Sequence, residues 1–371
     1  MTTQVFFETL EKQYKKKLPF VVYSRPINSI IKCWLQEDNT LYTTNDFSQS
    51  GFVFAPFDFS NPSILLPQNA CAFQSLENPE IAEVSESDVL NIGNYGKEEH
   101  LSLVQNGIES IKSGHLDKVV LSRVASADVK NSEPLEVFRR LYSTYKNAMV
   151  YCWYHPKVGL WLGATPELLF KVEGHLSTMI SLAGTQPFND SETVSWTKKE
   201  YDEQQIVTDY IVNQIEPFAS KIEVSEVDTV KAGNLLHLKS YIVSSINDKG
   251  QLKEIIKSLH PTPAVCGFPK QKAKDFILEN ENYDRAYYTG FLGELNLKQT
   301  KLRNNNRRNI ENSAYSAVKT YSNFYVNLRC AQIINKKALV YVGGGITRDS
   351  DPEKEWNETV NKTKTIVKVL N

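Results

Sequence analysis

The first quarter of the chain shows short apolar runs that are separated by turn-forming residues. The segment at 5–17 mixes apolar and charged residues in the manner of an amphipathic helix. The runs that follow are bounded by Pro, Asn, Asp and Gly, which predicts short β-strands at 19–26, 30–36, 40–44 and 51–57. The polar stretch at 75–100 contains turn residues and predicts a connector.

Beyond this connector, single helices alternate with groups of longer apolar strands. Apolar residues recur at helical spacing over 98–112, and Gly114 follows at the position of a C-terminal cap. Further helices are predicted at 134–145, 198–215 and 351–370, and strands at 118–126, 148–156 and 338–345. The segment at 159–174 predicts a strand, a turn and a second strand, and the segment at 175–185 predicts a strand that ends in a turn at Gly184 and Thr185. Groups of strands separated by single helices favour a mixed α+β fold over strict βαβ alternation.

Composition and charge exclude several classes of protein. The 371 residues include 42 Lys or Arg and 43 Asp or Glu, so the net charge is −1. Nucleic-acid binding and polybasic membrane anchoring both need a basic excess, and neither partner is expected. No apolar run approaches the ~20 residues of a membrane helix, and the first residues lack the layout of a signal peptide. We therefore expect a cytoplasmic globular protein.

Metal and disulfide chemistry based on cysteine or histidine is not expected. The five cysteines include no CxxC pair, and the six histidines include no HExxH pair. The tract at 298–312 is rich in Asn, Lys and Arg, which predicts a solvated loop between strands. Contact with nucleic acid through this tract is the alternative interpretation.

The three glycines at 343–345 come after a predicted strand and before the last helix. A dinucleotide loop would need the GxGxxG spacing, but Arg348 stands where the third glycine belongs. Two interpretations remain: an anion site at which glycines allow close approach to backbone amides, and a tight strand-to-helix turn.

Two predicted helices carry carboxylates beside their apolar stripes. Glu203 lies one turn before a stripe and on its side, where a carboxylate needs a partner or a metal. The stripe consists of Ile206, Val207, Tyr210, Ile211 and Ile215. On the last helix Glu355, Glu358 and Lys362 follow at i+3 and i+4. If the two helices meet, Glu203 and Glu358 would hold one Mg²⁺; a solvated, ion-paired face is the alternative.

Three other charged side chains border apolar strands. Lys118 opens the strand at 118–126, where partial desolvation would lower its pKa toward that of a general base. Glu167 lies between a Pro turn and an apolar strand, where burial would suit it to be a general acid. Arg329 is embedded in an apolar strand, and its guanidinium fits a carboxylate. A solvated lysine, a turn-stabilising glutamate and an internal salt bridge are the alternatives.

From about residue 95 to the C-terminus, the ordered motifs resemble the chorismate-utilising enzymes. They are DKVVLSR, WLGATPELLF, SLAGT, KKEYDEQQIV, LLHLKS, LHPTPAVCGFP, YDRAYYTGFLG, NLRCAQI and YVGGGITRDSDPEKEWNETVNK. The resemblance implies a single large α+β domain over 1–371, with a variable part at 1–95 and a catalytic core at 96–371. Each of its two lobes would hold an antiparallel sheet with flanking helices, and the active site would lie between them.

The resemblance also assigns roles to the candidate residues. Lys118 would be the general base that activates water, and Glu167 the general acid that protonates a leaving hydroxyl. Mg²⁺ would be held by Glu203 and Glu358, with Glu355 beside the metal. The residues that would bind the substrate are Gly184, Thr185, His237, Arg329, Gly343, Gly345 and Lys362.

Within the family, three features resemble the isochorismate synthases. Anthranilate synthases carry glutamine in place of Lys118, and aminodeoxychorismate synthases carry lysine in place of Ala183. The segment at 259–269 resembles the isochorismate synthase version of its motif. The implied activity is Mg²⁺-dependent isomerisation of chorismate to isochorismate, in a monomer without a glutamine amidotransferase subunit. A salicylate synthase and a non-catalytic chorismate-binding relative are alternatives, and the product would feed either menaquinone or siderophore synthesis.

Three positions depart from the family pattern. Gln204 follows Glu203 where relatives often carry histidine or asparagine, which would alter the surroundings of the metal. Gly344 stands where relatives often carry alanine. The tract between 298 and 322 is longer than the usual hairpin connection.

Overall fold

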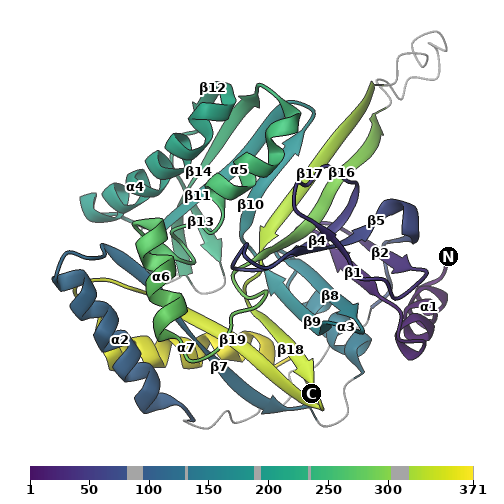
Figure 1. Ribbon diagram of the computed structural model, residues 1–371, viewed down its shortest axis with the longest axis horizontal. Helices are drawn as coiled ribbons and strands as arrows, with labels where there is room; N and C mark the ends of the chain where they lie inside the picture. Colours follow the sequence, from purple (N-terminus) through teal and green to yellow (C-terminus); the bar gives the residue numbers. More distant parts are fainter. Residues whose placement is uncertain (82–94, 130–132, 188–193, 233–234, 302–316, 371) are drawn as a thin grey trace.

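Two large antiparallel sheets, A and B, form the frame of the protein (Figure 1). The computed structural model describes residues 1–81, 95–129, 133–187, 194–232, 235–301 and 317–370. Every strand pairing within these residues is antiparallel, and helices flank both sheets. The predicted α+β class with antiparallel sheets is confirmed.

Sheet A contains nine strands. In spatial order they are β15 (Gly267–Phe268), β7 (Lys118–Asp128), β19 (Lys337–Ile346), β18 (Cys330–Ile334), β9 (Gly159–Thr165), β8 (Met149–His155), β1 (Phe20–Ser24), β2 (Ile30–Gln36) and β6 (Cys71–Glu77). Strand β7 is paired on one side with β19 and at its start with the short β15. This double pairing fixes the backbone at Lys118, the first residue of β7.

Sheet B contains ten strands, nine of which follow one path. In spatial order they begin with β12 (Ala219–Val224), β14 (Leu235–Ile246), β11 (Leu176–Pro187), β10 (Leu168–Glu173) and β17 (Ala317–Val326). They continue with β16 (Phe291–Lys301), β4 (Gly51–Ala55), β5 (Ser63–Pro67) and β3 (Tyr42–Thr44). The tenth position is taken by β13 (Asp228–Ala232), which pairs with β14 outside the main path.

The chain passes between the two sheets at two adjacent places. Strand β9 of sheet A leads into β10 of sheet B through Pro166 and Glu167, and β17 of sheet B leads into β18 of sheet A through 327–329. Because β9 pairs with β18 and β10 pairs with β17, the two crossings run side by side. The Thr165 hydroxyl donates to the Val326 carbonyl at 2.6 Å and ties them together.

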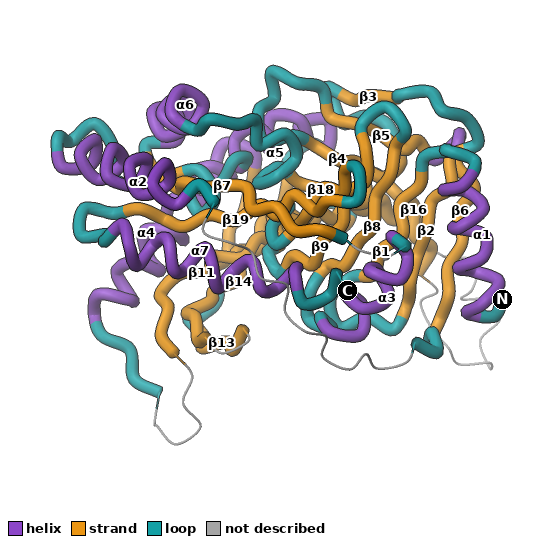
Figure 2. The backbone as a smooth tube through the Cα atoms, turned by 90° about the horizontal axis from the view of Figure 1, so that it is seen from below, coloured by secondary structure: helices purple, strands orange, loops and turns teal. Residues whose placement is uncertain are grey.

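Helices cover the outer parts of both sheets. They are α1 (Thr3–Lys15), α2 (Lys97–Lys112), α3 (Pro134–Thr144), α4 (Lys198–Ile215), α5 (Leu252–Leu259), α6 (Lys270–Asn280) and α7 (Pro352–Val367). Helix α4 packs on β11 and β14 of sheet B, while α2 and α7 pack on β7 and β19 of sheet A. Figure 2 shows α1 at one end of the molecule and α2 and α4 at the other. No helix among the described residues is long and apolar enough to span a bilayer.

The N-terminal quarter is built into both sheets. Strands β1, β2 and β6 belong to sheet A, and β3, β4 and β5 belong to sheet B. Phe54 of β4 stacks on Trp153 of β8, with ring centroids 4.6 Å apart, and on Tyr287 at 4.4 Å. All three rings belong to one aromatic cluster packed between the sheets, so the N-terminal strands supply part of the central core.

One local prediction about backbone conformation is confirmed and two are wrong. The strand predicted at 338–345 is confirmed, because the glycines at 343–345 lie inside β19, paired with 120–122 of β7, and do not form a tight turn. The chain does not turn at Gly184: β11 continues to Pro187 through a bulge, with Gly184 at φ +65°. Within the tract at 298–312, β16 continues to Lys301, and 302–312 lie outside the described residues.

A buried ion pair holds the start of β7 against the segment after α6. The Arg285 guanidinium binds both carboxylate oxygens of Glu281, at 2.6 and 2.7 Å, and each side chain is 2% exposed. Arg285 also donates to the Val120 carbonyl at 2.7 Å, and Glu281 accepts from the backbone of Ser122 at 2.8 Å. The two charged side chains therefore form hydrogen bonds with the backbone of β7 two and four residues beyond Lys118.

Replacing Glu281 with alanine should strongly destabilise the protein. Glu281→Ala would leave the Arg285 charge buried without its carboxylate, which costs ~3–5 kcal/mol of unfolding free energy. Urea titration followed by circular dichroism measures the change. The matched control is Glu353→Ala, which removes an exposed ion pair to Lys97 and should leave the midpoint in place. Equal, small shifts in the two variants would contradict the prediction.

Candidate active site at the junction of the sheets

Glu167 and Arg329 are brought together by the two crossings. Glu167 lies between β9 and β10, and its carbonyl accepts from the Val326 amide at 3.0 Å. The Arg329 carbonyl accepts from the Ala164 amide at 3.1 Å. The predicted strand through Arg329 is therefore wrong: β17 ends at Val326, β18 begins at Cys330, and Arg329 has φ +47° between them. The change of sheet breaks the strand that its apolar neighbours predict.

A cavity of about 580 Å³ opens beside Glu167 and Arg329. Its walls include Leu168, Met179 and Ile211, so part of the lining is apolar. Glu167 is the one acidic residue among the described lining residues, whereas the cationic ones are Lys146, Lys231, Lys239, Arg329 and Lys368. A concave surface with this excess of positive charge fits a small anionic ligand that also carries an apolar ring.

The Glu167 carboxyl has the electrostatics of a general acid. Burial raises the pKa of Glu167 to about 7, although the positive charges of Lys118 and Arg329 lower it. A carboxyl with this pKa keeps its proton near neutral pH and can donate it to a leaving group.

Lys118 has the complementary shift. Burial lowers the pKa of the Lys118 ammonium, and the positive charge of Lys362 lowers it further, while Glu203 and Glu167 act in the opposite direction. These interactions place Lys118 in electrostatic contact with side chains from three other elements. A lysine with a depressed pKa supplies more of the neutral amine that a general base requires.

The predicted glycines leave room for these charged groups. A Cβ atom at Gly345 would lie 3.0 Å from Lys118 Cε and 3.6 Å from its Nζ. A Cβ atom at Gly344 would lie 3.0 Å from Glu355 Oε2 and 3.8 Å from Glu358 Oε1. Residues 343–345 of β19 therefore lie between Lys118 of β7 and the carboxylates of α7.

Two carboxylates and one lysine line the α7 side of this strand. Lys362 Nζ lies 2.6 Å from Glu358 Oε1 and donates to the Gly343 carbonyl at 2.8 Å. Glu355 accepts from the Ser350 hydroxyl through Oε1 at 2.8 Å, while its buried Oε2 has no hydrogen-bond partner among the described residues. Burial raises the pKa of Glu355, and the neighbouring Glu358 raises it further.

These α7 oxygens fit a divalent cation. A buried carboxylate oxygen without a donor, next to a second carboxylate, is an arrangement that a cation stabilises. No group of three or more His, Cys, Asp or Glu in the described part of the chain is arranged to hold a metal ion. The carboxylates therefore do not form a closed ligand set, although Mg²⁺ commonly uses only one or two protein carboxylates and keeps several waters.

The predicted apolar stripe of α4 is partly wrong. Ile206 is 68% exposed, whereas Gln204 is 1% exposed and packs on sheet B. Polar partners on the sheet favour this rotation, because Ser181 and Ser240 receive the Gln204 amide. Glu203 consequently lies on an exposed part of the helix and not on the face that packs on sheet B. Its negative charge still reaches Lys118.

Gly184 and His237 meet on neighbouring strands of sheet B. His237 Nδ1 donates to the Gly184 carbonyl at 3.0 Å, and burial lowers the pKa of the imidazole. The neutral ring with hydrogen on Nδ1 is therefore favoured. Thr185 belongs to the same bulged part of β11, and its side chain is outside the described residues.

Tyr145 is a cavity residue that sequence reasoning missed. It lines the cavity with Arg329, and its hydroxyl donates to the Thr365 carbonyl at 2.6 Å beyond the acidic part of α7. Burial lowers the pKa of Arg329, while Tyr145 and Glu167 raise it. A tyrosine directly after a helix gives no sequence signal that it lines a cavity. The position of Tyr145 depends on its contact with the distant C-terminal helix.

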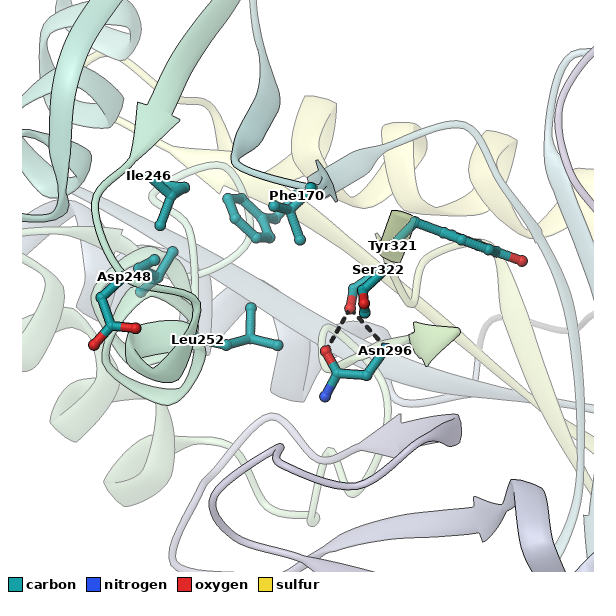
Figure 3. Close-up of a pocket in the computed structure, with 11 residues that line it drawn as sticks. Phe170, Ile246, Asp248, Leu252, Asn296, Tyr321 and Ser322 are labelled. Carbon is teal, nitrogen blue, oxygen red and sulfur yellow. Dashed lines mark hydrogen bonds between the residues drawn. The ribbon is translucent and has the colours of Figure 1, made fainter. Parts of the chain in front are cut away.

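A second cavity, of about 30 Å³, lies between β10, β17 and α5 (Figure 3). Phe170 and Leu252 line its apolar side, and Ser322 and Asn296 hydrogen-bond at its polar edge. A volume of this size holds about one water molecule. None of the predicted site residues lines it.

Comparisons with known proteins identify the family. A family model described as chorismate binding enzyme matches residues 61–301 and 315–371. The salicylate biosynthesis isochorismate synthase of Pseudomonas aeruginosa is 26% identical, over 70% of this chain and 52% of its own length. Isochorismate synthase MenF of Pasteurella multocida is 29% identical, over 72% of this chain and 60% of its own length. The matched part thus spans less than two thirds of either relative.

A solved structure supports the fold independently. The menaquinone-specific isochorismate synthase MenF of Escherichia coli superposes with a TM-score of 0.74 at 21% identity, covering 95% of this chain and 89% of that chain. At this identity the likeness establishes a shared architecture, and the family model, which matches most of the chain, establishes the family. The protein belongs to the chorismate binding enzymes.

Proposed function

We propose that the protein is an isochorismate synthase, an isomerase that converts chorismate into isochorismate. One observation carries the proposal: Lys118 and Glu167 are half-buried, their charged groups interact, and desolvation shifts their pKa values toward each other. Such a pair supplies a base and an acid in one site. The printed names of the relatives agree with this activity.

Lys118 and Glu167 would share the proton transfers of the reaction. The neutral Lys118 amine would take a proton from a water as that water attacks the ring. Protonated Glu167 would give its proton to the allylic hydroxyl as the bond to the ring breaks and the ring double bond shifts. One water enters and one leaves, so substrate and product have the same composition, and a proton must return from Lys118 to Glu167 before the next turnover.

The cationic cavity would hold the two carboxylates of the substrate. Arg329 offers a planar guanidinium for bidentate binding of one carboxylate, next to the acid. Backbone amides of the bulge at Gly184 and Thr185 and of the strand at Gly343 and Gly345 would bind the other polar groups. The His237 bond to Gly184 would hold that bulge in place.

Mg²⁺ would be held by Glu203 and Glu358, with Glu355 beside it. When bound, the ion would neutralise the substrate carboxylate and ease departure of the hydroxyl. Lys362 would keep Glu358 oriented through its 2.6 Å contact. Because the nucleophile would be water rather than ammonia, we propose activity without a glutamine amidotransferase subunit.

Incubation with chorismate tests the proposal directly. The purified chain is incubated with chorismate and either Mg²⁺ or EDTA, and the products are separated by chromatography and identified by NMR. We expect isochorismate with Mg²⁺ and none with EDTA. Salicylate and pyruvate would assign the chain to the sister activity, and unchanged chorismate under both conditions would refute catalysis.

Removing either half of the acid–base pair should abolish most of the turnover. Lys118→Ala and Glu167→Gln should each lower kcat by roughly 10²–10⁴-fold, because each native side chain would transfer a proton in the transition state. Steady-state kinetics at saturating chorismate and Mg²⁺ measures the loss. The exposed residues of α6 provide matched controls, Lys272→Ala and Glu279→Gln, which should retain the full rate. A retained rate in either site variant would refute that residue's role.

The pH dependence should follow the raised pKa of Glu167. The acid must be protonated to act, so the active fraction of Glu167 falls as the pH rises through about 7. Lys118 must be neutral, so its active fraction rises with pH, with a midpoint below that of an ordinary lysine. The two requirements oppose each other, so a pH profile of kcat/KM should be bell-shaped with one limb near pH 7. Glu167→Gln should lose the limb near pH 7 from its residual activity, and persistence of that limb would assign it to another group.

A further inference from the structure

The face of α4 that packs on sheet B carries a buried polar seam. We use this name for four side chains that are each 5% exposed or less: Ser181, Gln204, Thr208 and Ser240. Ser181 lies on β11 and Ser240 opposite it on β14, while Gln204 and Thr208 are one turn apart on α4. Apolar side chains usually fill such a helix–sheet contact, so the polar composition of this one needs an explanation.

Gln204 is the centre of the seam. Its Nε2 donates to the Ser181 hydroxyl at 2.9 Å and the Ser181 carbonyl at 3.2 Å, and it lies 3.4 Å from the Ser240 hydroxyl. Thr208 continues the network, with its hydroxyl 2.8 Å from that of Ser181 and 3.0 Å from the Gln204 carbonyl. One amide group thus joins the helix to both strands beneath it.

Overall stability does not explain the choice of glutamine. Gln204 Oε1 is buried and has no hydrogen-bond partner among the described residues. An unsatisfied buried acceptor is costly, and an apolar side chain of the same shape would avoid that cost. What directional hydrogen bonds provide, and apolar packing does not, is one defined position of the helix on the sheet.

The seam joins the parts of sheet B that carry predicted site residues. Glu203 directly precedes Gln204 on α4. Ser181 lies three residues before Gly184 on β11, and Ser240 lies three residues after His237 on β14. The bond between His237 and Gly184 links the same two strands at the site. A shift of α4 along the sheet would therefore move Glu203 relative to both strands and to Lys118.

We infer that Gln204 is the positioning residue for Glu203. By binding both strands, the Gln204 amide holds α4 where the negative charge of the exposed Glu203 carboxylate reaches Lys118. The inference rests on the proposed function, in which Glu203 would hold Mg²⁺. Partners that orient a metal ligand typically change metal affinity by 10–100-fold when removed.

Calorimetric titration of the full chain with Mg²⁺, with no substrate present, tests the inference. Gln204→Met keeps the length and burial of the side chain but removes its hydrogen bonds. We expect Mg²⁺ binding to weaken by roughly 10–100-fold. The matched control is Gln205→Met, the same change at the exposed neighbour whose side chain donates to Asp209 on the same helix, and it should leave the affinity unchanged. In turnover assays the Mg²⁺ concentration for half-maximal rate should rise while kcat at saturating Mg²⁺ is retained.

Thermal unfolding of the same variants separates positioning from folding. The midpoint of Gln204→Met should stay close to that of Gln205→Met, because an unsatisfied acceptor is removed together with the bonds. If Gln204→Met unfolds early, Gln204→Met combined with Ser181→Ala and Ser240→Ala, which also removes the two hydroxyl partners of the amide, is compared in its place. Unchanged Mg²⁺ affinity in a folded Gln204 variant, or equal weakening in the control, would overturn the inference alone. A native chain that binds no Mg²⁺ would overturn the metal assignment and the inference together.

Discussion

The site depends on two neighbouring segments that change sheets at the same level. Between Thr165 and Leu168 the chain leaves sheet A for sheet B, and between Val326 and Cys330 it returns. Backbone and hydroxyl bonds join the two crossings directly, including the 2.6 Å bond from Thr165 to Val326. Residues at such a junction take part in the strand pairing of neither sheet but are still packed between both sheets. Glu167 and Arg329 are therefore desolvated yet accessible to a ligand, a combination that the middle of a strand or an exposed loop does not provide.

Desolvation at this junction also accounts for the chemistry. Burial favours the uncharged form of every ionisable group, so it acts in opposite directions on the pKa values of Glu167 and Lys118. Their mutual attraction works against both shifts, but burial is the larger cause for each. The remaining charges lie around this pair on separate elements: Glu203 on α4, and the carboxylates with Lys362 on α7. The charges that surround Lys118 and Glu167 thus come from single side chains that are distant in the sequence.

Sequence patterns predicted the elements more reliably than their rotation or their connections. Helical spacing and turn residues placed α2, α4 and α7, and the apolar border of Lys118 predicted its lowered pKa. The rotation of α4 could not be predicted, because the partners of Gln204 lie on strands whose pairing is non-local. The break at Arg329 was missed for a related reason: its apolar neighbours are typical of a continuous strand, and only the change of sheet interrupts it. The proposed substrate was suggested by the order of motifs that resemble a known family, because hydrophobic spacing carries no information about a ligand.

The weaving of the N-terminal strands into both sheets has a consequence for synthesis of the chain. Strand β1 pairs with β8, and β4 pairs with β16, which ends at Lys301. Strand β5 follows β4 directly, but during translation β4 must wait, on the order of tens of seconds at typical ribosomal rates, before its second partner β16 emerges. Phe54, which is buried in the finished core, lacks its stacking partner Tyr287 for most of that time. The N-terminal strands therefore cannot complete their sheets until distant parts of the chain have been made, and their apolar side chains are exposed to aggregation in the meantime.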